Sequence, residues 1–96
     1  MSVEDKKAAI YAYLCEKFPN SEVEQKYDFN LGAQAFKIRL RDRVLLLKVG
    51  DEFVEDNAIA EILRQFNLWS LAEILGKETE LGVLATQRGL ETFRRG

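Results

Sequence analysis

The segment from residue 36 to residue 49, FKIRLRDRVLLLKV, constrains the fold more than any other part of the sequence. In its first half, apolar and basic residues alternate, which is the period of a strand with one buried face. In its second half, residues 44–47 are apolar without a break, as is typical of a strand that is covered on both faces. The segment therefore predicts a β-hairpin whose second strand lies inside a sheet.

The register of this hairpin follows from the need to keep one face apolar. A turn centred on Asp42 and Arg43 places Phe36 opposite Val49 and directs Lys48 outward. A shift by one residue would place Lys48 opposite Phe36, on the apolar face, and is rejected. Because Asp-Arg lacks the glycine that a tight two-residue turn prefers, a four-residue loop with the same centre is the alternative.

An amphipathic helix and a further strand precede the hairpin. Ser2 stands before acidic residues, which is the pattern of an N-cap and a first helical turn, and Pro19 ends the helix. Residues 22–31 then alternate between apolar and polar side chains, which predicts a half-buried strand. A turn at Gly32 would set Phe29 opposite Phe36. On the other face it would set Asp28 opposite Lys37 and Glu24 opposite Arg41, so the carboxylates of this strand answer the basic residues of the hairpin.

Four carboxylates and no cation occur between residues 51 and 56. The run lacks the alternating oxygen ligands and the glycine of a calcium loop, whereas helix N-termini attract acidic residues. It therefore predicts the start of a helix, with Asp56 or Asn57 as the N-cap and the first turn near Ala58, and not a metal site.

A second, short helix is expected after Trp69. Ser70 and Glu73 have the spacing of a capping box, and Gly76 is a suitable end. Trp69 itself is expected to be an anchor in the core or at the junction of the two helices.

These segments together predict one α+β domain over residues 1–96. Its N-terminal helix precedes an antiparallel meander sheet of three to four strands, and the later helices pack on one face of the sheet. Apolar residues near 81–84 suggest a fourth strand beside the second arm of the hairpin. Residues after 86 fit either a terminal helix or a fifth strand.

The composition removes most common catalytic designs. The chain has no histidine and a single cysteine, Cys15, so it cannot form a Ser-His or Cys-His pair, an internal disulfide or a Cys/His zinc set. Cys15 lies in the first helix, where a buried or inert thiol is expected. We expect no enzyme activity, no metal, no cofactor and no small-molecule ligand.

The location follows from the first residues and from the charge distribution. The start of the chain is acidic and amphipathic, where a secretory signal would be basic and then apolar. No stretch of membrane-spanning length lacks charge. We expect a cytoplasmic protein with no membrane contact.

The order of a helix, three antiparallel strands and a helix, over residues 3–68, resembles the topology of the double-stranded RNA-binding domain. That family contacts RNA through a long loop between its first two strands and through a lysine-rich start of its second helix. Here residues 31–33 and the acidic residues 50–57 occupy those places. The resemblance therefore implies a similar order of elements and does not imply RNA binding.

A surface on the outer side of the predicted sheet gives the only positive indication of function. In the predicted register, Val44 and Leu46 emerge there beside Arg39 and Arg41. Exposed aliphatic residues need a cover, either from the C-terminal segment of the chain itself or from another chain. We expect a small non-catalytic protein-interaction module whose partner is an unidentified protein or a second copy of the chain. The alternative is weak nucleic-acid binding through Lys37, Arg39 and Arg41, which the net charge of −2 does not favour.

Overall fold

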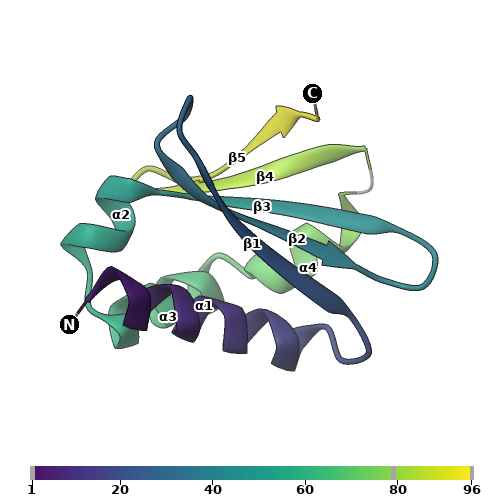
Figure 1. Ribbon diagram of the computed structural model, residues 1–96, viewed down its shortest axis with the longest axis horizontal. Coiled ribbons are helices and arrows are strands. Elements are labelled where there is room, and N and C mark those ends of the chain that lie inside the picture. The colour runs from purple at the N-terminus through teal and green to yellow at the C-terminus, as the bar shows by residue number, and fades with distance from the viewer. Residues whose placement is uncertain (1, 79, 96) are drawn as a thin grey trace.

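The computed structural model describes residues 2–78 and 80–95. Helices and strands alternate in groups along the chain, in the order α1 (Val3–Lys17), β1 (Glu22–Asp28), β2 (Ala33–Arg39), β3 (Val44–Gly50), α2 (Asp51–Asp56), α3 (Ile59–Leu68), α4 (Leu71–Lys77), β4 (Leu81–Thr86) and β5 (Gly89–Arg94). The strands form one sheet in the order β1-β2-β3-β4-β5. Figure 1 shows α1, α3 and α4 below one face of this sheet and α2 at its end.

The α+β class, the N-terminal helix, the antiparallel meander and the helices on one face are confirmed. The segment that follows α4 is a β-hairpin, so the alternative of a terminal helix is wrong. β4 pairs with β3, as the unbroken apolar run of β3 requires, and the two strands are parallel. Parallel neighbours need a long crossover connection, and α2, α3 and α4 provide it.

The β2–β3 hairpin has the predicted faces but a register shifted by two residues. Phe36 pairs with Leu47 and not with Val49. The loop covers residues 40–43, and the Leu40 amide donates to the Arg43 carbonyl at 2.8 Å. The four-residue loop therefore begins one residue earlier than expected, and the even shift leaves the apolar side chains on the same face.

The predicted β1–β2 register is also wrong, because β1 ends at Asp28 and not at residue 31 as expected. The Asp28 carboxylate accepts hydrogen bonds from the amides of Asn30 and Leu31, and the Gly32 amide donates to the Asp28 carbonyl. These bonds turn the chain directly after Asp28, as aspartate often does in loops. Tyr27 therefore pairs with Gln34, and the predicted Phe29–Phe36 pair does not form.

α1 begins with the capping box in which Ser2 and Asp5 bond to each other's backbone amides. Its inner side carries Lys6, which is buried and donates to the Val54 carbonyl at 2.8 Å at the C-terminal end of α2. The last turn exposes Cys15, so the thiol is not buried, and its inertness stays a prediction. Its neighbour Leu14 faces the core, and adjacent helical residues point in different directions.

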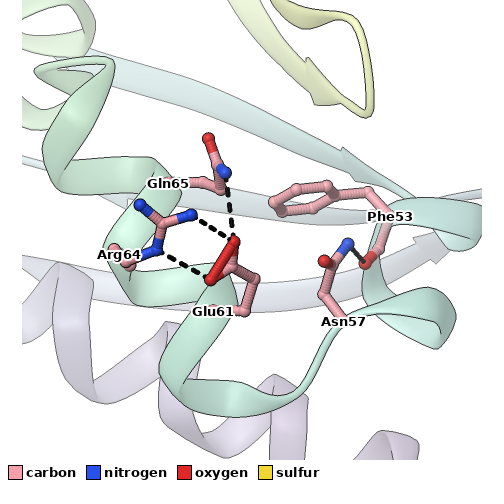
Figure 2. A network of polar contacts seen from close by, with 5 residues as sticks. All are labelled: Phe53, Asn57, Glu61, Arg64 and Gln65. Carbon is pink, nitrogen blue, oxygen red and sulfur yellow. Dashed lines mark hydrogen bonds and ion pairs between the residues drawn. The ribbon is translucent and has the colours of Figure 1, made fainter.

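The acidic run forms its own short helix, which corrects the predicted helix start. α2 contains all four carboxylates and buries Phe53 and Val54 between them. α3 begins after Ala58, which is its N-cap and makes no side-chain cap bond. Asn57 instead ends α2, and its side-chain Nδ2 donates to the Phe53 carbonyl at 2.8 Å (Figure 2).

α3 and α4 close the core over the sheet. Trp69 is the predicted anchor, since its ring is partly buried and lies 5.5 Å from that of Phe53 and 6.5 Å from that of Phe66. Ser70 is the N-cap of α4, but its backbone is left-handed with φ of 54° and the predicted capping box is not formed. The buried apolar core comprises Ile10, Tyr13, Leu14, Phe36, Ile38, Leu45, Leu47, Val49, Phe53, Val54, Ile62, Phe66, Leu71, Leu75, Val83 and Ala85. Across the described residues, no helix is long and apolar enough to cross a membrane.

Gly82 in β4 leaves no room for a side chain, because the ring of its β5 partner Phe93 lies over it. A Cβ atom at Gly82 would lie 2.1 Å from Phe93 Cζ. We expect Gly82→Ala to displace the ring and to lower the free energy of unfolding by about 1–3 kcal/mol, the range for overpacked sites.

The control for this prediction is the same change in a Phe93→Ala background. Without the ring, Gly82→Ala should be nearly neutral, because alanine loses less backbone entropy than glycine on folding. Urea denaturation of the single and double variants gives the coupling between the two positions. Additive losses would show that the ring is not what excludes a side chain from position 82.

Candidate functional site

The outer face is the sheet face opposite α1, α3 and α4, and it carries the candidate residues. In β3, Leu45 and Leu47 are buried under the helices, whereas Val44 and Leu46 alternate with them and are half-buried on the outer face. Val44 pairs with Arg39 of β2, so these residues lie together as predicted. Arg41 does not lie in a strand and stands in the exposed β2–β3 loop at the end of this face.

Ion pairs on the outer face differ from those predicted. Glu24 pairs with Arg39, at 3.5 Å between carboxylate and guanidinium, and not with Arg41. Lys37 lies opposite Glu24 in the sheet, but its amine is in no ion pair with a described residue. Lys26 is likewise exposed and without an ion pair in the described part of the chain. The aliphatic side chains are therefore flanked by cations that remain available to a partner.

Lys48 is the central polar contact of the outer face. Its amine lies 2.8 Å from the Asp28 carboxylate and 4.6 Å from the centre of the Phe93 ring. Because Asp28 belongs to β1 and Lys48 to β3, the ion pair spans β2. The hydrogen bond from Lys48, together with the Leu31 and Asn30 amides, lowers the pKa of Asp28 below its ordinary value.

A small hollow of about 80 Å³, the central hollow, lies beside this ion pair. Ala35 lies between Lys26 and Lys48 in the paired strands, and its short side chain leaves the space open. Lys37 and Leu46 form the next row and line the same hollow. The hollow is thus apolar at its floor and basic around its rim, and it can accept part of one side chain.

A larger hollow of about 600 Å³, the end hollow, opens where β3 runs into α2. Gly50 and Thr86 lie at its floor in the strands, and Leu31 and Arg88 belong to the loops on either side. Its full lining is Leu31, Gly32, Gly50, Asp51, Glu52, Phe53, Thr86, Gln87, Arg88 and Glu91. Three carboxylates and one guanidinium give the end hollow a net negative charge.

The β1–β2 loop carries the most exposed apolar side chain, which the sequence pattern did not indicate. Phe29 is 87% exposed and Leu31 is 49% exposed. Tyr27 packs edge-on against Phe29, and its hydroxyl donates to the Asp51 carboxylate. Figure 1 shows this loop standing out on the side of the sheet away from the helices. Alternation alone suggested that Phe29 and Leu31 are buried; the signal for their exposure is Asp28, which ends the strand before them.

The bond between Tyr27 and Asp51 also sets the protonation of this tyrosine. The hydrogen bond to the Asp51 carboxylate, desolvation and the neighbouring carboxylates raise the pKa of Tyr27 above its ordinary value. The Tyr27 hydroxyl therefore remains a neutral donor near neutral pH, and it is not available as a base.

Other polar groups have structural explanations. Arg64 and Gln65 donate to the Glu61 carboxylate within α3 and lower the pKa of Glu61 to about 2 (Figure 2). This contact joins neighbouring turns of one helix, which is a common helix-stabilising pair. Over residues 2–78 and 80–95, no group of three or more His, Cys, Asp or Glu side chains is arranged to hold a metal ion.

Comparisons with protein-family models, with curated proteins and with solved structures found no match to this chain. The outer face therefore has to be interpreted by its own chemistry. It offers half-buried aliphatic side chains, two hollows of opposite charge and an exposed aromatic loop.

The lowered pKa of Asp28 leads to a pH prediction. A carboxylate whose pKa is lower in the folded state stabilises the fold above its ordinary pKa, and this stabilisation is lost as the pH falls through the folded pKa. The stability of the wild type relative to Asp28→Asn should therefore be constant above about pH 5 and decline below about pH 4. Melting curves at a series of pH values measure this difference.

Lys48→Met is the matched variant for this prediction, since methionine keeps the aliphatic length without the charge. In this variant the pKa of Asp28, followed by carboxyl NMR signals, should rise towards its ordinary value. It should remain somewhat low because the amides of Asn30 and Leu31 still donate. An unchanged pKa would show that Lys48 is not the main cause of the shift.

Proposed function

We propose that this chain is a cytoplasmic, non-catalytic protein-interaction domain that binds its partner through the outer face of the sheet. The observation that carries the proposal is that Val44 and Leu46 are partly exposed while Leu45 and Leu47, which alternate with them, are buried. In the described part of the chain, Figure 1 shows α1, α3 and α4 on the other face of the sheet. The β4–β5 hairpin extends the sheet beside β3 and does not cross over it. An aliphatic surface with available cations at its border is typical of a protein-binding patch.

A catalytic role receives no support from the available side chains. The chain has no histidine. Desolvation raises the pKa of Tyr13, and the bond to Asp51 raises that of Tyr27, so both hydroxyls stay protonated near neutral pH and neither is available to accept a proton. Cys15 is exposed on α1, and the part of the chain with described structure places no histidine or metal site beside it.

Nucleic-acid binding is the weaker candidate for the same surface. The cations Lys37 and Arg41 are available, but Arg39 is paired with Glu24, and Glu22 lies opposite Arg39. A phosphate backbone would meet these carboxylates as well as the cations. We expect only weak binding without sequence preference, and it should decline steeply as salt is added.

Threonine at positions 44 and 46 tests whether these side chains are open to solvent or are covered by another part of the chain. Threonine keeps the branched shape that suits a strand, and water can satisfy its hydroxyl on an open surface. We expect Val44→Thr with Leu46→Thr to lower the free energy of unfolding by no more than about 2 kcal/mol and to abolish association. Melting curves and light scattering measure the two effects.

The inner-face pair Leu45→Thr with Leu47→Thr is the matched control. These side chains are fully buried, so the hydroxyls would lack water and the domain should lose most of its stability. Equal losses for the two double variants would mean that Val44 and Leu46 are covered, and the outer face would then be no binding surface.

Photo-crosslinking identifies what the outer face binds. A photoreactive amino acid at Leu46 should form protein adducts in the native cells. The same group at Leu68, which is 64% exposed on α3, should not. Adducts with a different protein or with a second copy both support a protein-binding face. The absence of adducts at position 46, or equal adducts at both positions, would reject the proposal.

A further inference from the structure

The two ends of the outer face carry opposite charges. At one end, the β2–β3 loop exposes Arg41 and Arg43 on either side of Asp42, so its net charge is positive, and the two arginines are in no ion pair among the described residues. At the other end, the end hollow is lined by Asp51, Glu52 and Glu91. Among the described residues that line it, Arg88 is the one cation. A second copy of the same surface, turned end for end, therefore presents the complementary charge at each end.

The spacing of the two ends is set by β3. This strand runs from Val44, beside the basic loop, to Gly50, at the floor of the end hollow. At the usual rise the two ends are about 20 Å apart. When two such faces are stacked with antiparallel strands, the basic loop of each copy lies over the end hollow of the other. Both contacts then form at once, which a single peptide ligand would not achieve.

Between the ends, β1 is the strand whose charges are complementary in this arrangement. The row of Glu24 lies over the row of Lys26 of the second copy, and Lys26 lies over Glu24 of the second copy. On β2, Lys37 comes over Ala35 at the floor of the basic-rimmed central hollow, and on β3, Leu46 comes over Lys48. These two strands therefore add no charge complementarity, and the charged ends carry the pairing. Glu22 would face Asp28 of the second copy, but Lys48 already neutralises that carboxylate.

The exposed apolar loop has a place in the same arrangement. Leu31 lines the end hollow, and Phe29 is exposed in the same β1–β2 loop. Figure 1 shows this loop on the side of the sheet away from the helices. In the stacked pair Phe29 and Leu31 reach the end of the second copy where Val44 lies half-buried. Burial of these side chains would provide the apolar part of the contact.

We propose that the protein forms a two-fold dimer in which the outer faces pack on each other with antiparallel strands, with the basic β2–β3 loop of each copy in the end hollow of the other. The proposal rests on the function proposed above and names the partner as a second copy. The contact is isologous, so it closes at two copies and does not continue into a filament. We expect a weak dimer with a dissociation constant on the order of micromolar.

Charge reversal tests this dimer. Arg41→Glu with Arg43→Glu makes the loop acidic, and Glu52→Lys with Glu91→Lys makes the end hollow basic. Each variant alone places like charges at both contacts, and its dissociation constant should rise by about a hundredfold. An equimolar mixture should form a heterodimer, because an acidic loop then meets a basic hollow and a basic loop meets an acidic hollow. Sedimentation equilibrium from micromolar to millimolar concentration measures all of these species.

Lys7→Glu with Lys77→Glu is the control. It lowers the net charge by the same amount as the Arg41/Arg43 variant, but on α1 and α4, away from the outer face. This control should dimerise like the wild type, and melting curves check that every variant is folded. A wild type that stays monomeric, a reversal variant that dimerises like the wild type or a mixture that remains monomeric overturns the dimer. The protein-binding function survives any of these results if the crosslinks from position 46 lead to a different protein.

Discussion

The position of β3 between an antiparallel and a parallel neighbour is the constraint on which the rest of the structure depends. The parallel pairing with β4 requires a crossover, and α2, α3 and α4 supply it. α3 and α4 lie on the same face as α1, so all three pack on the apolar side of the strands (Figure 1). The longer helices α1, α3 and α4 therefore all lie on the inner face of the sheet. The bare outer face is therefore a consequence of the topology and not of any single surface residue.

Asp28 connects this topology with the chemistry of the outer face. It ends β1 by accepting two loop amides, and its other oxygen holds the Lys48 amine at 2.8 Å. The first role releases Phe29 from the sheet and exposes it. The second holds Lys48 over β2 and beside the Phe93 ring. One carboxylate thus determines both the apolar loop and the central charge of the surface.

Hydrophobic periodicity predicted the strands and their faces because it reports which side chains must be buried. It did not determine the hairpin registers. A shift by two residues keeps every side chain on its face, so the pattern around Phe36 fits Val49 and Leu47 equally well. The loop hydrogen bonds of Asp28 and Leu40 select the observed registers. The alternation of apolar and polar residues does not report such bonds.

For the candidate site, the sequence likewise predicted which residues share a face but not which distant segments meet. Arg39, Val44 and Leu46 lie together as expected, because a register shift of two residues leaves every side chain on the same face of the sheet. The end hollow was not predicted, since Gly50, Thr86 and Glu91 meet only through the parallel pairing of β3 and β4. The acidic run was assigned to the wrong helix, because burial of Phe53 and Val54, and not a capping side chain, makes α2 a separate element.

The crossover between β3 and β4 also affects the order in which the protein folds. β1, β2 and β3 are joined by short loops, whereas β4 can pair with β3 only after about thirty intervening residues have been brought back to the sheet, at an entropic cost that grows with their number. Contacts of long sequence separation slow folding, so the β4–β5 hairpin should dock after the three-stranded meander. Until it docks, β3 is an edge strand with unpaired amides and carbonyls around Leu47 and Val49. During synthesis this edge is the part of the chain most open to pairing with a strand of another molecule.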